Sequence, residues 1–397
     1  MSKGVPSVLF INRVYPPSSG ATGEMLAAMA EALALRGWEV TVLATAEGGT
    51  EPFSKAGGVR VARAGRPLSR RTFFSRAMSY VTMIPALFIR ALMLPRMDFV
   101  VTLTDPPMLA SIGPLLAFFK RSRSIHWAQD IYPELAEELG VLSHGGMPAR
   151  LLRAVSTWSL RCHDRVVSIG RCMSSRLAAR GIDGERVTTI PNWTVPQSIH
   201  PMDHVSNLFR AAQGWGSRFV VVYSGNMGLA HEFDIVLDAA QELRDENILF
   251  VFIGDGPRRV EVERKAAGRG QTNVRFLPPQ PRGKLNESLS AADVHLVTMR
   301  PELCGLVVPS KFYGVMAAGR PCIYVGPAES EVARLITEHA VGRVVASPFS
   351  SDLAKAIVTY RDDLAMWSAE CARARLLGEA SDVNAAATAF SRMLQGL

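Results

Sequence analysis

Two glycine-bearing loops contain the first candidate residues for binding an anionic ligand. Gly20 and Gly23 lie in a loop over residues 15–24 that leads into a helical pattern, and Gly225 and Asn226 lie in a similar loop over residues 223–228. Glycine lets backbone N–H groups approach a ligand closely, and a helix amino-terminus favours an anion such as a diphosphate. Alone, each loop is typical of a tight turn between a strand and a helix. Two such loops at the ends of two sheets predict a cleft that holds a nucleotide.

A candidate lysine for binding an anion lies in the segment 300–321. Pro309 and Ser310 are typical of a helix start, and Gly319 followed by Pro321 is typical of a helix end. Lys311 then falls in the first turn, where the helix dipole favours acidic side chains. An exposed lysine on an ordinary helix is the simple alternative, but the local conflict favours an anionic ligand beside Lys311.

Elements that alternate between strands and helices must position these loops. β-rich apolar runs at 7–12, 40–44, 99–104, 124–128, 165–169 and 187–190 form one series, and runs at 219–224, 248–254, 274–277, 294–298 and 321–325 form another. Helical patterns between them, such as 23–36, 234–243 and 311–318, predict an α/β protein with two doubly wound Rossmann-like units. We expect domains at 1–195 and 216–379, joined near 191–216, and a C-terminal helix at about 380–397 that packs back onto the first domain.

Composition excludes several classes of protein. With 48% hydrophobic and 20% charged residues, the 397-residue chain predicts a folded protein with a large core. The five cysteines are scattered, which predicts neither a disulfide nor a structural zinc site. The first apolar run, residues 8–11, is shorter than the core of a signal peptide. We therefore expect a protein that is not exported and that binds no metal.

Positive charge is concentrated in the first half of the chain. Residues 1–200 carry 23 basic and 14 acidic residues, whereas the remainder carries 21 and 22. No nucleic-acid-binding signature accompanies this surplus, so an anionic membrane surface is the predicted partner, contacted through residues about 55–123. Within that range, the uncharged stretch 77–89 is compatible with an interfacial segment on lipid and equally with a buried helix that has a basic rim.

Several motifs together resemble one known family. They are the Gly20/Gly23 loop followed by RGWEVTVL at 36–43, DRVVSIG at 164–170, RVTTIPN at 186–192, GDGP at 254–257, and PSKFYGVMAAGRP at 309–321. In this order the chain resembles glycosyltransferase family 4, a GT-B group, and in particular its bacterial branch for O-antigen, capsule and colanic-acid-type surface polysaccharides. The resemblance implies that the second domain binds the nucleotide and the first binds the acceptor.

The resemblance also assigns roles to residues. Glu302, with Gly305 after it, matches the family's acid that approaches the donor sugar, and Asp130 follows Gln129 where the family often has a His-Asp pair. We predict Asp130, Glu302 and Lys311 as catalytic residues. Predicted donor-binding residues are Gly20, Gly23, Gly225, Asn226, His231, Gly254, Asp255, Gly256, Arg300, Gly305 and Ser310, and predicted acceptor-binding residues are Arg13, Thr22, His126 and Glu134.

The sequence departs from the family at the diphosphate. The family's usual Arg and Lys after the second glycine loop align with Asn226 and His231, and its second acidic residue has no clear counterpart. Fixed positive charge is needed where a diphosphate leaves, so Lys311 is the first candidate, ahead of Arg300 and Arg13.

The expected activity is metal-independent transfer of a sugar, with retention of configuration. The expected donor is a UDP-linked N-acetylated amino sugar and the expected acceptor is linked to polyprenyl diphosphate, at the cytoplasmic face of the plasma membrane. We expect no cofactor and no obligate protein partner. A sugar-nucleotide epimerase of the same architecture and a non-catalytic protein that binds nucleotide sugars on a membrane are the two alternatives.

Overall fold

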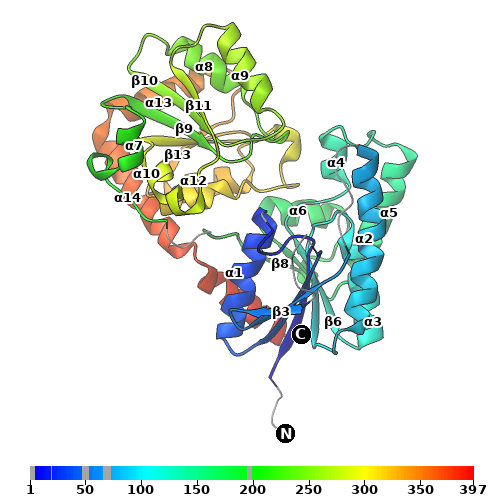
Figure 1. The fold of residues 1–397 in the computed structure, drawn as a ribbon. Helices are drawn as coiled ribbons and strands as arrows, with labels where there is room; N and C mark the ends of the chain where they lie inside the picture. The colour runs from blue at the N-terminus through cyan, green and yellow to red at the C-terminus, as the bar shows by residue number, and fades with distance from the viewer. Residues whose placement is uncertain (1–4, 19, 47–52, 66–72, 195–198) are drawn as a thin grey trace. The chain divides into compact units, whose positions relative to one another are not determined.

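The computed structural model divides the chain into two compact α/β units. It describes residues 5–18, 20–46, 53–65, 73–194 and 199–397. The first unit comprises Met1–Asn192, Gly305–Val307 and Val383–Leu397, and the second comprises Trp193–Cys304 and Val308–Asp382. Each unit contains its own sheet (Figure 1). The last helix of the chain therefore belongs to the first unit.

The first unit is built on an eight-stranded sheet in the order β3-β4-β2-β1-β5-β6-β7-β8. All neighbours are parallel except β3 and β4, which form an antiparallel hairpin at one edge. Its strands are β1 (Ser7–Ile11), β2 (Glu39–Ala44), β3 (Phe53–Ala56), β4 (Val59–Arg63), β5 (Phe99–Thr102), β6 (Arg123–Ala128), β7 (Arg165–Ser168) and β8 (Val187–Thr189). Its helices are α1 (Ala21–Leu35), α2 (Phe73–Met93), α3 (Gly113–Lys120), α4 (Glu134–Glu138), α5 (Met147–Cys162), α6 (Arg171–Ala179) and α15 (Val383–Gln395), with 3₁₀ turns at Leu109–Ile112 and Gly184–Arg186.

The second unit is built on a six-stranded parallel sheet in the order β11-β10-β9-β12-β13-β14. Its strands are β9 (Phe219–Ser224), β10 (Ile248–Ile253), β11 (Val274–Leu277), β12 (Val294–Thr298), β13 (Cys322–Val325) and β14 (Gly342–Val345). Its helices are α7 (Leu208–Ala212), α8 (Asp234–Glu242), α9 (Arg259–Gly268), α10 (Leu285–Ser290), α11 (Lys311–Ala317), α12 (Glu331–His339), α13 (Ser350–Asp362) and α14 (Leu364–Ala380), with 3₁₀ turns at His204–Ser206, Arg282–Lys284 and Pro301–Leu303. The strand order is that of a Rossmann fold. Strands β9 to β11 follow one another toward one edge of the sheet, and β12 to β14 follow one another toward the other edge, so the order switches between β9 and β12.

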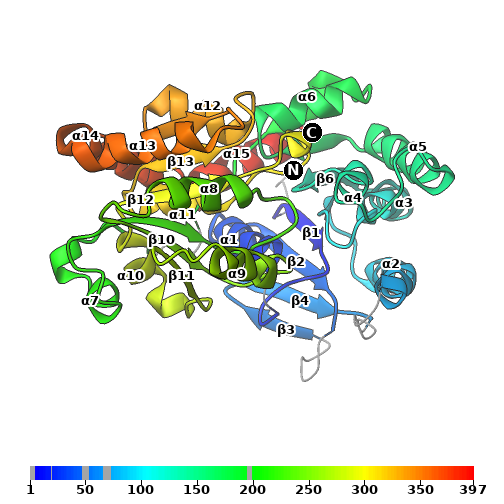
Figure 2. The same cartoon turned by 90° about the horizontal axis from the view of Figure 1, so that it is seen from above.

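Apolar side chains bury both faces of the first sheet. Leu9 and Ile11 of β1 pack with Met83 and Leu87 of α2 on one face. On the other face α15 packs against α1, and Phe390 lies 5.9 Å from Phe10, ring centroid to ring centroid. Figure 2 shows α15 and α1 in this unit, with α2, α3 and α5 grouped at its other side. The C-terminal helix is thus part of the core of the first unit.

The α2 helix favours the buried reading of the segment 77–89. Met83, Leu87 and Ala91 are fully buried in the core, whereas Ile89 and Met93 are exposed on the opposite face. Among the residues that the structure describes, no helix is long and apolar enough to cross a membrane.

The basic count over 55–123 overstates the charge on the surface. Arg63 is buried and donates to the carbonyl oxygens of Tyr15 and Thr45. Lys120 is buried and donates to the Leu94 carbonyl oxygen at 2.6 Å. Arg66, Arg70 and Arg71, which were part of the same count, lie outside the described residues. The described surface of this stretch therefore carries less positive charge than the sequence indicated.

Candidate functional site

The first unit gathers charged side chains where its strand order reverses, between β1 and β5. Register pairs Ile11 with Thr102 and Thr102 with His126, so the residues after β1, β5 and β6 emerge side by side. Arg13 follows β1 and forms a two-toothed ion pair with Asp105, with Nε–Oδ1 and Nη2–Oδ2 distances of 2.6 Å. Asp130 follows β6. Open α/β sheets bind ligands at this kind of reversal point.

Asp130 is a carboxyl group in an unfavourable setting. Its backbone N–H reaches the Thr104 hydroxyl at 3.3 Å, but within the described part of the chain no donor is bonded to its carboxylate. Burial, with the negative charge of Asp105 as a second cause, raises the pKa of Asp130 to about 7. A carboxyl that titrates near neutrality beside a pocket is a candidate for acid or base chemistry or for binding a hydroxyl group.

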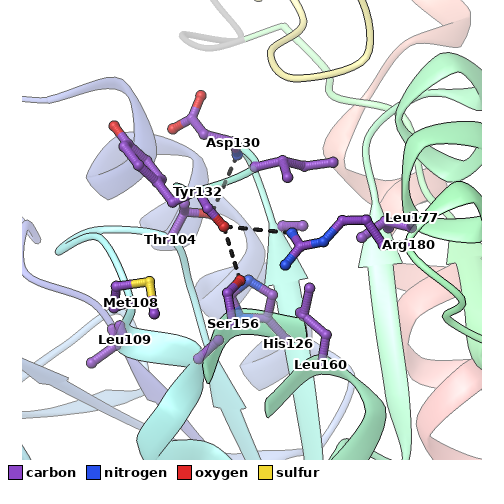
Figure 3. Close-up of a pocket in the computed structure, with 13 residues that line it drawn as sticks. Thr104, Met108, Leu109, His126, Asp130, Tyr132, Ser156, Leu160, Leu177 and Arg180 are labelled. Atoms are coloured by element: carbon purple, nitrogen blue, oxygen red, sulfur yellow. Dashed lines mark hydrogen bonds between the residues drawn. The ribbon is translucent and has the colours of Figure 1, made fainter. Parts of the chain in front are cut away.

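A narrow pocket lies beneath Asp130. Its lining combines apolar and polar side chains: Thr104, Met108, Leu109, Ala110, His126, Ala128, Asp130, Ile131, Tyr132, Ser156, Leu160, Leu177 and Arg180. The Tyr132 carbonyl oxygen accepts from the Ser156 hydroxyl at 2.8 Å and from Arg180 at 3.5 Å (Figure 3). Figure 3 also shows the Asp130 carboxylate turned away from His126. The carboxylate is therefore at the rim of the pocket, and His126 is in its depth.

Two predicted acceptor-binding residues, His126 and Glu134, interact with other side chains of the protein. His126 is buried, its Nδ1 lies 3.1 Å from the Thr102 hydroxyl, and burial lowers its pKa to about 3, so it is neutral at physiological pH. Glu134 lies 3.4 Å from Arg153 and 3.5 Å from Arg180. His126 therefore lines the pocket as a neutral imidazole, and the Glu134 carboxylate is already paired with two guanidinium groups.

The first glycine loop begins a helix as expected. α1 starts at Ala21, directly after Gly20, and Thr22 lies in its first turn. A Cβ on Gly23 would lie 2.8 Å from Val14 Cγ1 and 3.0 Å from the Val14 carbonyl oxygen. Gly23 is thus explained by close packing of α1 on the loop after β1, while Gly20 and Thr22 keep the predicted place at the helix start.

The second glycine loop packs against the loop after the neighbouring strand. Register pairs Ser224 with Ile253, so Gly225 and Gly254 lie side by side. A Cβ on Gly254 would lie 2.1 Å from the Gly225 carbonyl oxygen, and one on Gly256 would lie 2.6 Å from Asn226 Oδ1. Both positions also have φ near +147°, which favours glycine. The helix predicted after this loop at 234–243 is confirmed, because α8 spans Asp234–Glu242 and residues 226–233 connect it to the loop.

A pocket of about 460 Å³ lies over these loops in the second unit. It is lined by Ser224, Gly225, Asn226, Ile253, Gly254, Asp255, Gly256, Pro279, Gln280 and Leu285. Five of the predicted donor-binding residues therefore share one cavity at the carboxyl ends of β9 and β10, where a Rossmann fold binds its nucleotide.

Lys311 lies against the Gly225 loop. Its Cε is 3.4 Å and its Nζ 3.7 Å from the position of a Cβ on Gly225. The Nζ donates to the Tyr223 hydroxyl, and it lies 3.2 Å from His231 Nε2 and 3.9 Å from the centre of the Tyr223 ring. Burial lowers the pKa of Lys311 to about 7. Lysine and histidine, which the sequence proposed separately, are thus neighbours.

The other residues of the late motif are divided between the units. Arg300 Nε lies 3.6 Å from Glu302 and 3.9 Å from Glu232, so its charge is shared by two carboxylates. Ser310 directly precedes α11 but makes no side-chain cap hydrogen bond. Gly305 belongs to the first unit, where a Cβ would lie 2.7 Å from the Cys172 carbonyl oxygen. Its glycine identity is explained by that packing.

Sequence reasoning missed four residues of these sites. Asp105 and Arg180 in the first unit, and Tyr223 and Gln280 in the second, were not proposed. Asp105 and Gln280 each follow a predicted parallel strand, so their place at the carboxyl edge of a sheet was an available signal. Arg180 follows helix α6 and Tyr223 lies within a strand, where no local pattern distinguishes them.

Comparison with known proteins identifies both units. The chain matches the family "Glycosyl transferase 4-like domain" over residues 20–193 and the family "Glycosyl transferases group 1" over residues 218–363. Each unit therefore resembles a glycosyltransferase domain. The fold of the chain is GT-B: it superposes on Anabaena HepE, solved in complex with UDP and glucose, with a TM-score of 0.74 and 17% identity over 99% of this chain and 100% of that one.

Two curated relatives of the chain come from bacteria. It is 31% identical to the probable glycosyltransferase WbjE of Pseudomonas aeruginosa over 62% of each chain. It is 30% identical to WcaI of Escherichia coli K12, a putative colanic acid biosynthesis glycosyl transferase, over 56% of this chain and 55% of that one. The chain thus spans about three fifths of the length of the curated relatives it matches.

The described residues of the protein contain no group of three or more His, Cys, Asp or Glu side chains that could hold a metal ion. Transfer without a metal stays a prediction.

Proposed function

We propose that this protein transfers a sugar from a UDP-sugar to an acceptor linked to polyprenyl diphosphate, in bacterial surface polysaccharide synthesis. An N-acetylated amino sugar is the proposed donor group, and retention of configuration the proposed outcome. One observation carries the proposal: Lys311 lies against the glycine loop beside a pocket of nucleotide size. The UDP complexes of HepE, a protein of the same fold, support a nucleoside diphosphate as the ligand of the second unit.

The proposed reaction breaks the bond between the sugar C1 and the diphosphate oxygen. A bond from C1 to an acceptor hydroxyl oxygen forms, and the proton of that hydroxyl passes to the leaving diphosphate, so that UDP is released. Negative charge grows on the diphosphate as the bond breaks, and fixed positive charge there lowers the barrier. Lys311 and the N–H groups of the Gly225 loop are the groups proposed to supply it.

Asp130 is proposed to serve the acceptor side. It lies at the rim of the pocket of the first unit. Its carboxylate can accept a hydrogen bond from a ligand, because no described residue donates to it. A carboxyl that titrates near pH 7 can hold an acceptor hydroxyl in either protonation state. Glu302 is half exposed, and among the described residues its ion-pair partner is Arg300 at 3.6 Å; we propose that it approaches the donor sugar.

A peripheral position at the cytoplasmic face of the plasma membrane is proposed from one face of the first unit. Helices α2, α3 and α5, which lie together in Figures 1 and 2, contain no Asp or Glu. Their exposed side chains include large apolar ones: Met93 at 71%, Phe118 at 78%, Phe119 at 63%, Leu151 at 67% and Trp158 at 51% exposure. Exposed apolar side chains on helices that contain basic and no acidic residues fit an anionic lipid surface. The proposed contact therefore extends to α5, beyond residues 55–123.

Product analysis tests the proposed activity. The protein is incubated with a panel of UDP-sugars, with and without a polyprenyl-diphosphate-linked saccharide, and products are identified by mass spectrometry. UDP release that requires the acceptor, with a heavier lipid product, supports transfer. An epimerised sugar nucleotide without acceptor would support the epimerase, and donor binding without any product would support the non-catalytic protein.

Vesicle sedimentation tests the membrane face separately. We expect stronger binding to anionic than to neutral vesicles, weakened by salt. Phe118→Glu should reduce binding at least tenfold, because it places a carboxylate in the apolar contact. Leu35→Glu is the matched control, since Leu35 is 85% exposed on α1 of the same unit. Equal loss in both variants, or equal binding to both kinds of vesicle, would contradict the assignment of this face.

A further inference from the structure

Lys311 is held by two neutral groups. Its Nζ donates to the Tyr223 hydroxyl oxygen, and that hydroxyl donates onward to the Asn226 carbonyl oxygen at 2.7 Å. His231 Nδ1 lies 2.6 Å from the Thr298 carbonyl oxygen, which can only accept, so Nδ1 carries the ring proton. The free Nε2 lone pair then faces Lys311 Nζ at 3.2 Å. Both partners of the lysine therefore accept hydrogen bonds without carrying charge.

Among the residues that the structure describes, no negatively charged side chain pairs with Lys311. The two N–H groups of the neutral amine face Tyr223 and His231, so the N–H that forms on protonation is left for a ligand. The other titratable neighbours are Cys322 on β13, whose thiol is kept protonated by burial, and Arg258, which donates to the His231 carbonyl oxygen at 2.8 Å. Burial also lowers the pKa of His231 to about 3, so this ring stays neutral. The lysine is the group of this cluster that can gain a proton near pH 7.

We propose that Tyr223 and His231 are positioning residues that hold Lys311 uncompensated, so that binding of a nucleoside diphosphate is coupled to uptake of one proton by Lys311. The inference rests on the proposed function, because it takes the donor diphosphate as the ligand. The balance is simple: the neutral amine, one proton from solvent and the diphosphate give an ammonium paired with the bound anion. A lysine paired with a carboxylate would already be charged before the diphosphate binds, and no proton would be taken up on binding.

Calorimetry with UDP-N-acetylglucosamine measures the coupling. Both phosphates of this probe are esterified, so the probe itself does not titrate near neutral pH. Titrations in buffers of different ionisation enthalpy give the number of protons taken up. From a pKa of about 7 for Lys311, we expect about 0.1 proton at pH 6 and about 0.9 at pH 8.

Variants distinguish a positioning role from a purely structural one. Lys311→Arg keeps a permanent cation, so uptake at pH 8 should vanish. His231→Glu supplies the missing counter-ion, so the lysine is charged before binding and uptake should fall close to zero. Tyr223→Phe removes one acceptor and should weaken binding at least tenfold. His339→Gln, a substitution at an exposed residue of α12, is the matched control and should leave uptake unchanged.

A measurement on the free protein separates this inference from the proposed function. Labelling with acetic anhydride across pH, read by mass spectrometry, gives the titration midpoint of Lys311 without any ligand. A midpoint near 7 supports the uncompensated lysine even if no UDP-sugar binds, in which case the donor assignment fails alone. A midpoint near 10, or binding at pH 8 without proton uptake, overturns the inference while leaving a donor site in place.

Discussion

Replacing Asp130 by Asn should stabilise the protein while removing its activity. Asn keeps the shape of the side chain without its charge. Since burial and Asp105 raise the pKa of Asp130 from 3.8 to about 7, ionising this carboxyl costs more in the folded protein than in the unfolded chain. At about 1.4 kcal/mol per pKa unit the difference is at most about 4 kcal/mol, an upper limit because the side chain keeps some contact with solvent.

The sign of the pH dependence follows from the raised pKa. The stabilising contribution of the neutral carboxyl is complete below pH 3.8 and is lost as the pH rises to about 7. Asp130→Asn should therefore gain most at pH 8, up to about 4 kcal/mol, and less than half of that at pH 5. For a unit of this size the gain at pH 8 corresponds to a rise in Tm on the order of 10 °C.

Calorimetric melting of both proteins at pH 5 and pH 8, with transfer assays on the same samples, measures the two effects. Asp164→Asn is the matched control, because the Asp164 carboxylate accepts from Ser124 N–H and Arg123 and its loss should destabilise the unit at both pH values. A fall in Tm of Asp130→Asn at pH 8, or a change that is equal at both pH values, would refute the reasoning. Full activity of the variant would remove Asp130 from the proposed site.

Three further predictions follow from packing and charge. Gly254→Ala places a Cβ 2.1 Å from a carbonyl oxygen and should abolish UDP binding in calorimetry, whereas Gly268→Ala, with nothing within 4 Å, should bind UDP normally. Phe390→Ala should lower the free energy of unfolding of the first unit by about 3–5 kcal/mol, measured by urea denaturation, because this fully buried ring packs on Phe10. Asp105→Asn removes a negative charge beside Asp130, so the acidic limb of the kcat/KM profile should move to lower pH.

Most of the fold could be predicted because its signals are local. Buried parallel strands are short apolar runs between turn residues, and 219–224, 274–277 and 294–298 were predicted with the bounds that the structure has. The hairpin β3–β4 and the strand β14 were not predicted, because these strands have only four or five residues each and basic side chains interrupt their apolar runs.

Some site residues have a signal in the sequence around them, and others depend on contacts with distant parts of the chain. Lys311 was proposed because a lysine in the first turn of a helix conflicts with the local dipole, and the structure places it against the Gly225 loop. His231 was proposed from its alignment position, but its role depends on its tautomer, which the Thr298 carbonyl oxygen fixes from another strand. Gly23 and Gly305 match family motifs, and the structure adds a packing reason for each, because side chains and backbone lie against them. Their predicted donor-binding role stays a prediction.

Tyr223 shows why a neutral residue that positions a charged group is harder to predict from sequence than the charged group itself. In sequence it is one more apolar-looking residue of a buried strand, and 1% of its surface is exposed. Only the fold places its hydroxyl where it can accept from Lys311 and donate to the Asn226 carbonyl oxygen, 88 residues before the lysine that it holds. A charged group and its ligand leave a compositional signal, but a neutral partner that only fixes the position of the charge leaves none. Neutral positioning residues in GT-B proteins are therefore to be sought from hydrogen-bond geometry around the unpaired cation.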